Sequence, residues 1–469
     1  MSTELLDHFQ SKQQTIEERI AAGKALRKKF PRINQGQYKP SANRIDPVSI
    51  LMAQGETRLP DLVPIRYARM LTSPFAFLRG AAAIMAADLK ANGETSGIQV
   101  QACGDMHVAN FGVFASAERN LIFGINDFDE TLPGPWEWDL KRLVASIVAS
   151  GRFLGADKNL CRDSVVAAVK TYRNKMKQFA RMGYMDLWYS RISDKDILKT
   201  LSPSARKGAE KIFGKAKERT HLQVLGKLTD LVDDKYRLQE NAPFIIRATH
   251  AQDGRPIEQA LAKLLESYFL SLSDDRKALL KNYRIVDVAR KVVGVGSVGT
   301  RCWIIFLLGN NANDPLFLQV KEAQPSVLEP VVSPSTYTNH GQRVVAGQRL
   351  IQAAPDIFLG WGMEAGIHFY VRQLRDMKGG VEFDPKKVTV KNMPQYSSLC
   401  AWALALSHAK SGDAAMISGY VGNSEELDDA MVRFAFAYAD QTEKDHQALA
   451  VAGKSGRIKV AAEGREAKN

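Results

Sequence analysis

Two short stretches of the sequence carry residues whose types and spacing could perform chemistry. In CGDMHVANFG, residues 103–112, Asp105 and Asn110 lie five positions apart. In INDFDE, residues 125–130, Asp127 follows Asp105 by 22 positions. Phosphoryl transfer needs a carboxylate beside the attacking hydroxyl, and an Asn and a second Asp to hold Mg²⁺ against the phosphates. The two stretches together supply this set, so the sequence predicts a metal or phosphate site.

Each of these residues also has a plainer interpretation. Asp and Asn often make turns, although the pairing of both stretches favours a site. His107 is a metal ligand or a brace within the loop, and bracing is favoured because a lone histidine defines no transition-metal site. Asp129 and Glu130 either join the metal ligands or cap the next loop. Asp139 opens an apolar helix, and we expect it to tie that helix to the 103–112 loop.

A second motif lies far along the chain, in VVGVGSVGTR, residues 292–301. The GxGxxG spacing of its glycines also marks dinucleotide-binding turns, which need a helix directly afterwards and an acid about 20 positions later. Here a strand-like stretch, CWIIFLLG, follows, and a lysine stands 22 positions after the last glycine. A glycine-rich hairpin followed by a strand with a lysine is the protein-kinase arrangement. Alongside the acidic stretches, this predicts cofactor binding by Gly294, Gly296, Ser297, Gly299 and Lys321 rather than a plain hairpin.

The elements that must position these residues follow from the residue patterns. Helical patterns cover residues 3–29 and 74–90, a buried helix starts at Asp139, and residues 161–282 are charged and helical. Alternating apolar residues predict a strand before each acidic stretch, the two forming one hairpin. From Tyr283 the chain is rich in β-branched residues, with strands, a helix over 339–354 and a strand pair near 370. Helices over 396–410 and 428–451 close the chain.

The order of the two motifs predicts a permuted fold. In ordinary kinases the glycine loop precedes the catalytic loop, whereas here it comes second. We expect an α+β, kinase-like, two-lobed fold that is circularly permuted, with a mainly helical large lobe. The expected units are an N-terminal extension (1–73), a helical large lobe (74–282), a small nucleotide-binding lobe (283–391), closing helices (392–452) and a flexible tail (453–469).

Composition excludes several other classes of protein. The 469 residues are 45% hydrophobic and 25% charged, which excludes disorder as the main state. No apolar stretch approaches the roughly 20 residues of a membrane span, and no secretory signal opens the chain, so we expect a cytoplasmic protein. The four cysteines are scattered without a CxxC pair, which argues against a zinc site or disulfides. The net charge of +13 suits an anionic nucleotide; the basic stretch 199–219 is expected to be a solvated helix face, because no nucleic-acid-reading motif accompanies it.

The chain resembles a known family through several long motifs. PIRYARMLTSPFAFLRGAAAIMAADLK, CGDMHVANFGVF and INDFDETLPGPWEWDLKRLVAS, followed by VGVGSVGTRCW, LQVKEAQPSVL and YADQTEKDH, are similar to an uncharacterised bacterial family catalogued as domain of unknown function 2252. The likeness covers nearly the whole chain.

The acidic stretches also resemble those of aminoglycoside and choline kinase-like phosphotransferases, whose Gly-Asp-x-His-x-x-Asn loop matches residues 104–110. The resemblance implies that Asp105 is the catalytic base, that Asn110 and Asp127 hold Mg²⁺, and that Lys321 holds the phosphates of ATP. Kinases pair this lysine with a glutamate on the next helix, but residues 339–354 contain none. Glu329 lies too early in the chain to be this glutamate, and Gln342 or Gln348 could take the place of the glutamate that the helix lacks.

These observations favour an ATP- and Mg²⁺-dependent phosphotransferase acting on a hydroxyl of an unidentified small molecule or protein. The expected partners are a nucleoside triphosphate and that acceptor; the oligomeric state is open. A nucleotide-binding pseudokinase and a nucleotidyl (AMP) transferase are the alternatives, and a basic nucleic-acid-associated protein is a weaker one.

Overall fold

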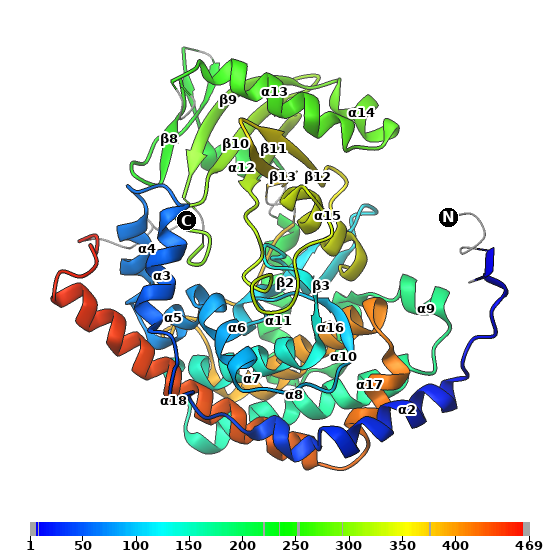
Figure 1. The fold of residues 1–469 in the computed structure, drawn as a ribbon. Helices are drawn as coiled ribbons and strands as arrows, with labels where there is room; N and C mark the ends of the chain where they lie inside the picture. Colours follow the sequence, from blue (N-terminus) through cyan, green and yellow to red (C-terminus); the bar gives the residue numbers. More distant parts are fainter. Residues whose placement is uncertain are drawn as a thin grey trace.

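Helices predominate in the computed structural model, which describes residues 6–7, 9–218, 221–233, 235–250, 254–292, 294–374 and 377–462 (Figure 1). The α-helices are α2 (Ile16–Lys29), α3 (Pro47–Glu56), α4 (Val63–Met70), α5 (Pro74–Gly80), α6 (Ala82–Ala91), α7 (Trp136–Leu154), α8 (Lys158–Phe179), α9 (Tyr184–Tyr189), α10 (Asp194–Thr200), α11 (Pro203–Glu218), α12 (His221–Leu228), α13 (Ile257–Leu270), α14 (Asp274–Leu280), α15 (His340–Ile351), α16 (Met393–Ser411), α17 (Ala414–Val421) and α18 (Glu426–Lys454). Short 3₁₀ turns are η1 (Arg32–Gly36), η2 (Val108–Asn110) and η3 (Val390–Asn392).

The strands pair in antiparallel sheets, so the fold is mixed α+β. They are β1 (Gln99–Ala102), β2 (Phe111–Ala115), β3 (Leu121–Ile125), β4 (Leu132–Pro135), β5 (Ile192–Ser193), β6 (Thr229–Val232), β7 (Lys235–Leu238), β8 (Ile245–Arg247), β9 (Arg284–Lys291), β10 (Cys302–Leu308), β11 (Pro315–Glu322), β12 (Gly360–Glu364) and β13 (Ile367–Gln373). The largest sheet has the order β12-β13-β11-β10-β9-β8. The predicted hairpin around the glycine motif is confirmed, because β9 and β10 pair directly across it.

The six-stranded sheet has a hydrophobic core of its own. One face packs against α13, where Leu264 and Tyr268 bury apolar side chains together with Ile305, Leu318 and Val371 of the strands. Figure 1 shows α13 and α14 covering this sheet at the top of the view. The expected boundary at residue 283 therefore divides elements that share one core, since β8, α13 and α14 all precede it.

The larger core is built from two parts of the chain, one before and one after the six-stranded sheet in the sequence. Helices α7 and α8 pack with α16, α17 and α18, and their buried side chains form one cluster with those of β1 to β4. Helix α7 is buried along almost its whole length and starts with Glu137 and Asp139, which suit the positive end of a helix dipole. It ends at Gly155, whose φ of +82° is the left-handed conformation of a helix C-terminus.

Several sequence expectations need correction. Residues 161–282 are not continuously helical, because β5 to β8 lie among the helices. The helix expected over 3–29 is interrupted: residues 6–7 and 9–10 are helical, residues 11–15 are not, and α2 begins at Ile16, where Thr15 and Glu18 form a capping box. Residues 1–5 and 8 lie outside the described residues. The two strands before the acidic stretches do not form one hairpin, since β1 pairs with β4 and β3 pairs with β2.

Both terminal segments pack against other parts of the protein. The segment before residue 73 is packed against the glycine loop: the N–H of Leu59 donates to the Gly299 carbonyl at 2.8 Å. Beyond α18, Ile458 is buried and the N–H of Ala461 donates to the Pro64 carbonyl at 3.1 Å. The segment expected to be a tail therefore starts with packed residues, and 463–469 lie outside the described part of the chain.

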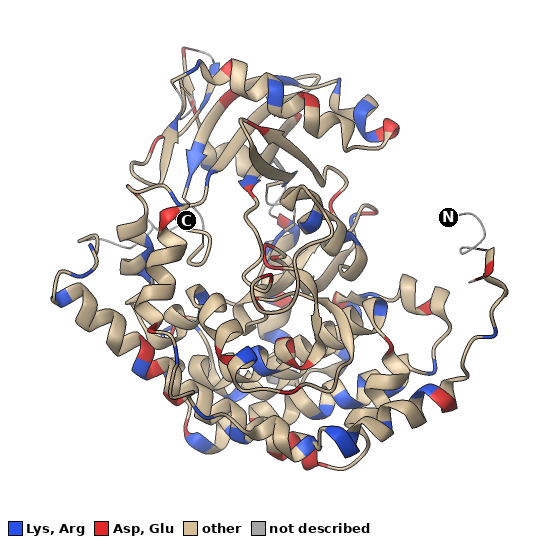
Figure 2. Ribbon diagram, viewed as in Figure 1, with Lys and Arg blue, Asp and Glu red and all other residues tan. Residues whose placement is uncertain are grey.

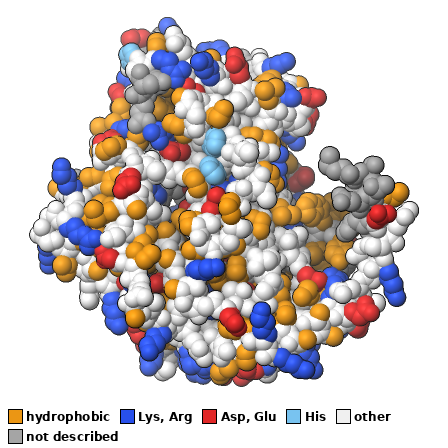
Figure 3. All heavy atoms as spheres, viewed as in Figure 1, with side chains coloured by type: hydrophobic (Ala, Val, Ile, Leu, Met, Phe, Trp, Pro, Cys, Tyr) orange, Lys and Arg blue, Asp and Glu red, His pale blue; other side chains and the backbone are white. Residues whose placement is uncertain are grey.

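The basic stretch 199–219 forms a solvated helix face, as expected. Helix α11 buries Ala205, Phe213 and Ala216. Its exposed side chains include Arg206, Lys207, Lys211, Lys215 and Lys217; Arg219 lies outside the described residues. Figure 2 shows basic and acidic residues interspersed over the ribbon, and Figure 3 shows the same mixture on the visible face. Across the described residues, the helices all fall short of the length and apolar character that crossing a bilayer requires.

Replacement of Lys141 by Met is expected to stabilise the protein. Lys141 lies in α7, is 7% exposed, and has its ammonium 5.0 Å from the ring centroid of Phe434. Burial lowers the pKa of Lys141 to about 8. Below about pH 8 Lys141 is charged in both the folded and the unfolded chain, so the full cost of burying the charge lowers the stability of the fold. This cost vanishes by about pH 10.5, because the unfolded chain then also loses the proton. Denaturant unfolding should give a gain of about 1–3 kcal/mol at pH 7 that shrinks by pH 10; a pH-independent difference would contradict this explanation.

Candidate active site

The two motifs predicted from the sequence meet in one cavity of about 160 Å³. The acidic stretches reach it from the loops after β1 and β3, and the glycine motif reaches it from the turn between β9 and β10. The predicted residues that line it are Asp105, His107, Asn110, Asp127, Asp129, Gly294, Gly296 and Ser297. The structure thus brings together residues that lie almost 200 positions apart in the sequence.

Lys321 is paired with carboxylates from the second acidic stretch. Its ammonium lies 2.6 Å from Oδ2 of Asp129 and 3.8 Å from Oδ1 of Asp127. Lys321 stands opposite Tyr370 in the β11–β13 register, and the Tyr370 hydroxyl donates to Oδ1 of Asp129 at 2.6 Å. Ser297 of the glycine turn donates to Oδ2 of Asp129 at 3.1 Å. Asp129 therefore joins the glycine turn to the sheet.

The charge states of Asp129 and Lys321 follow from the groups around them. Burial alone would raise the pKa of Asp129, but Lys321 and Tyr370 outweigh it and hold that pKa well below its usual range. Burial likewise opposes the positive charge on Lys321, yet Asp127 and Asp129 raise its pKa well above the ordinary lysine value. The pair is therefore ionised at neutral pH.

Asp127 is the best placed carboxylate for a metal ion. Its side chain is 42% exposed, but the surrounding protein partly dehydrates the carboxyl and, together with the neighbouring charge of Asp129, raises the pKa of Asp127. The side-chain amide of Asn110 donates to the main-chain carbonyls of Asp105 and Asp127, at 3.2 and 3.1 Å, and so joins the two acidic stretches. No group of three His, Cys, Asp or Glu side chains within the described ranges is arranged to hold a metal. A Mg²⁺ ion commonly takes only one or two carboxylates, with phosphates and water completing its shell, so these residues still fit one.

Asp105 is held by an arginine from α7. The Arg142 guanidinium donates to Oδ1 of Asp105 at 2.6 and 2.8 Å, which leaves Oδ2 facing His107 at 3.8 Å. Burial raises the pKa of Asp105 above the ordinary aspartate value, against the pull of Arg142. Burial and nearby arginines keep His107 neutral by lowering its pKa. A raised pKa suits a carboxylate that accepts a proton.

The loop that carries Asp105 is held by hydrogen bonds from the helical core. Asp139 accepts hydrogen bonds from the N–H groups of Cys103 and Gly104, at 2.6 and 2.9 Å. This confirms the role expected for Asp139. His408 of α16 lies 3.3 Å from the same carboxylate, and the hydroxyl of Tyr172 is 2.8 Å from the other ring nitrogen of His408. Three helices thus position one loop.

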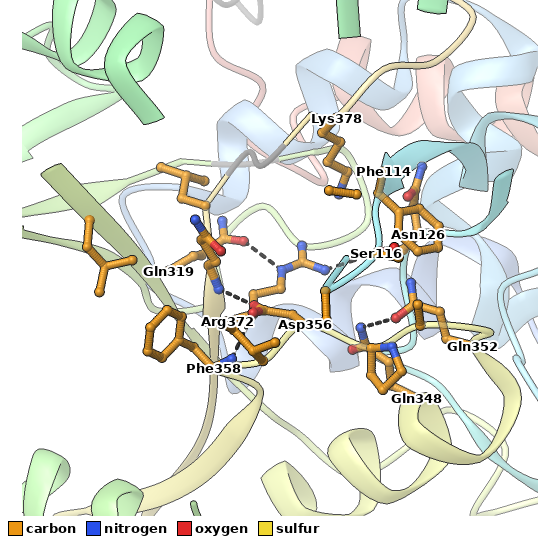
Figure 4. A pocket seen from close by; sticks show the side chains of 18 of the residues that line it. Phe114, Ser116, Asn126, Gln319, Gln348, Gln352, Asp356, Phe358, Arg372 and Lys378 are labelled. Atoms are coloured by element: carbon orange, nitrogen blue, oxygen red, sulfur yellow. Dashed lines mark hydrogen bonds between the residues drawn. The ribbon is translucent and has the colours of Figure 1, made fainter. Parts of the chain in front are cut away.

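A larger pocket of about 520 Å³ adjoins the acidic cavity, and Gly294 lines both. Figure 4 shows Arg372 near its centre, where the guanidinium donates to Gln319 at 3.0 Å and to the Asn126 carbonyl at 3.2 Å. Gln348 of α15 points to Gln352, with 2.7 Å between their amides. The size and the mixed polar and apolar lining are those of a small-molecule site.

Two details of this region differ from the sequence expectations. Gly299 and Lys321 are not among the residues that line the cavity; the φ of Gly299 is +95°, and a side chain there would contact Arg58 at 3.0 Å. The partner of Lys321 is not Glu329, Gln342 or Gln348. Glu329 instead accepts from the N–H of Ser326 at 2.9 Å and lies 3.7 Å from the imidazole of His340. Lys321 of β11 pairs instead with Asp129, on the loop that follows β3.

Sequence reasoning missed several residues of the site. Arg142 and Tyr370 gave no separate signal, although Arg142 follows Asp139 by three positions on a helix and Tyr370 alternates with other inward residues of its strand. Arg58, Arg66 and Arg79, which also line the cavity, lie in a segment that was expected to be peripheral or merely helical.

Comparison with known proteins identifies the family. The chain belongs to the family described as an uncharacterized protein conserved in bacteria, DUF2252, whose model matches residues 58–452. The family resemblance seen in the sequence is thereby confirmed. No curated protein and no solved structure matches the chain.

Proposed function

We propose that this member of an uncharacterised bacterial family is an ATP- and Mg²⁺-dependent phosphotransferase with a kinase-like, circularly permuted, two-lobed fold. One observation carries the proposal: the glycine-turn residue Ser297 and the carboxylates Asp127 and Asp105 line a single cavity, and buried Lys321 contacts Asp127 and Asp129 of its lining. A lysine for phosphates, a glycine-rich turn above them, an aspartate for Mg²⁺ and an aspartate for the acceptor are the parts that phosphoryl transfer requires.

The order of elements supports the fold assignment. The glycine turn joins β9 to β10, Lys321 follows on β11, and helix α15 comes next, which is the kinase order within the nucleotide-binding lobe. The loop with Asp105 precedes these elements, while α16 to α18 follow them and return to the helical core. A circular permutation accounts for both facts.

The two cavities suggest how ATP would bind. The 520 Å³ pocket has room for the base and ribose, and the 160 Å³ cavity is of a size for phosphate groups. Gly294 lies where the two meet, so the nucleotide would pass beneath the glycine turn. Lys321 would hold the phosphates, and Asp127 with Asn110 would hold Mg²⁺, which when bound supplies positive charge against the phosphate oxygens.

Asp105 is placed to act on the acceptor. The acceptor oxygen bonds to the γ-phosphorus of ATP while the bond from that phosphorus to the β,γ-bridging oxygen breaks and ADP leaves. The proton of the acceptor hydroxyl passes to Oδ2 of Asp105, the oxygen that Arg142 does not engage. Arg142 fixes the orientation of this carboxylate.

A thermal-shift screen with ATP, GTP, AMP and Mg²⁺, separately and together, tests the proposal. We expect a nucleoside triphosphate with Mg²⁺ to raise the melting temperature most, because a ligand at 100 times its Kd adds about 2.7 kcal/mol. Mass spectrometry of acceptors after incubation then separates gain of a phosphoryl group from gain of an adenylyl group. Binding without transfer would identify a pseudokinase, and no stabilisation by any nucleotide at millimolar concentration would refute nucleotide binding.

A further inference from the structure

Arginines line the acidic cavity in addition to the predicted residues. They are Arg58 from the loop before α4, Arg66 within α4 and Arg79 within α5. None of them belongs to the two motifs recognised in the sequence. Their presence places positive charge beside Asp105 and His107, since Arg79 lowers the pKa of both groups.

Arg66 is buried with most of its hydrogen-bonding capacity unused. The residue is 1% exposed, and its Nη2 donates to Gln54 at 2.8 Å and to the Gly80 carbonyl at 3.0 Å. Its Nε and Nη1 atoms are buried without a hydrogen-bond partner. Leaving charged donors unsatisfied away from water is costly, so such groups call for a partner.

Arg58 shows the same pattern beside the glycine turn. Its Nη1 donates to the Gly296 carbonyl at 2.7 Å and also to the Val298 carbonyl, while its buried Nε has no partner. In the part of the chain that the structure describes, neither Arg58 nor Arg66 forms an ion pair with a carboxylate. Buried arginines elsewhere do: Arg173, for example, binds Asp428 with contacts of 2.8 and 3.1 Å.

The cavity has room for an anion that would pair with these arginines. Its 160 Å³ is several times the roughly 30 Å³ share of a water molecule, yet well below the roughly 300 Å³ of a typical whole-ligand pocket. A phosphate group fits this space, and arginine forks match its oxygens. In the proposed function the phosphates of ATP already have Lys321, which lies against Asp127 and Asp129, whereas Arg79 lines the cavity together with Asp105, the residue assigned to the acceptor.

We propose that Arg58, Arg66 and Arg79 bind a phosphate group of the acceptor, so that the enzyme phosphorylates a hydroxyl of a small phosphomonoester. The assignment to the acceptor rests on the proposed function, because it depends on the role of Asp105. The anion site itself rests on the cavity and on the unpartnered guanidinium atoms of Arg58 and Arg66.

Inorganic phosphate is the probe for this site. It is titrated against the full-length protein at constant ionic strength, with and without Mg²⁺ and a non-hydrolysable ATP analogue that fills the γ-phosphate position. We expect phosphate to raise the melting temperature in both cases. If the analogue abolishes the phosphate effect, the arginines bind the γ-phosphate and the assignment to an acceptor is overturned.

Three variants connect the effect to the arginines. Arg66→Met and Arg58→Gln are each expected to weaken phosphate binding at least tenfold. Arg173→Met, which breaks a satisfied buried pair outside the site, should lower the melting temperature more than Arg66→Met does, yet retain the phosphate shift. A phosphate shift unchanged in both site variants reflects general stabilisation by the salt and overturns the proposal.

The same titrations separate this inference from the proposed function. A phosphate shift that needs the arginines, in a protein that no nucleotide stabilises, supports the anion site and refutes the phosphotransferase. Stabilisation by Mg²⁺ and nucleotide, in a protein that phosphate by itself does not stabilise, supports the phosphotransferase and refutes the anion site.

Discussion

Asp105→Asn is expected to slow phosphoryl transfer by about 10²–10⁴-fold, the usual contribution of a positioned general base. The asparagine keeps the shape of the side chain and one oxygen for Arg142, but it cannot take the proton of the acceptor hydroxyl. Nucleotide affinity should change little, because Lys321, Ser297 and Asp127 hold the phosphates and metal in our proposal. Nucleotide consumption and acceptor phosphorylation measure the first effect, and thermal shift with Mg²⁺ and ATP measures the second.

Asp428→Asn is the matched control for this variant. Asp428 pairs with buried Arg173 much as Asp105 pairs with Arg142, but it lies on α18, outside the site. Both variants weaken a buried ion pair and should lose stability, whereas only Asp105→Asn should lose turnover by the folded protein. An undiminished transfer rate in Asp105→Asn would remove Asp105 from the mechanism.

Lys321→Met should have the largest combined effect on nucleotide binding and stability. Removal of the ammonium leaves Asp129 without its cation, and breaking buried pairs of this kind costs about 3–5 kcal/mol. The cost here should lie at the lower end, because the Asp129 side chain is 25% exposed. Binding of Mg²⁺ and ATP should weaken at least tenfold, since the phosphates lose a charge-assisted contact.

A double variant separates the two effects. In Lys321→Met with Asp129→Asn only Asp127, whose side chain is 42% exposed, keeps a charge without the lysine. Tyr370 and Ser297 can still hydrogen-bond the amide, so denaturant unfolding should show much of the stability regained. Nucleotide affinity should stay low, because the lysine is still absent. Lys141→Met, the same change at a buried lysine outside the site, should leave nucleotide affinity unchanged. Recovery of affinity in the double variant would show that Lys321 acts only by neutralising Asp129.

Local sequence patterns correctly predicted the helices and strands whose apolar residues recur at the spacing of that element. The β-branched stretch from Tyr283 became β9, and the apolar helix opened by Asp139 became α7, because alternation and helical spacing are local properties. The pairing of β1 with β4 instead of a hairpin with β3 was not predictable in this way. Strand pairing joins residues distant in sequence, and no short motif records which partner buries more apolar surface.

The sequence by itself determined which residue types can perform the chemistry: Asp105, Asn110 and Asp127 at their spacing, and a lysine on the strand after a glycine-rich turn. Only the tertiary structure decided which charges neutralise one another. It gave Lys321 the carboxylate of Asp129 as its partner in place of a helix glutamate. It also placed Arg58 and Arg66 at the acidic cavity with no carboxylate of the described residues in ion-pair contact with either. The physical reason is that ion pairing depends on distances of a few ångströms and on burial, which are set by packing between segments that lie far apart along the chain.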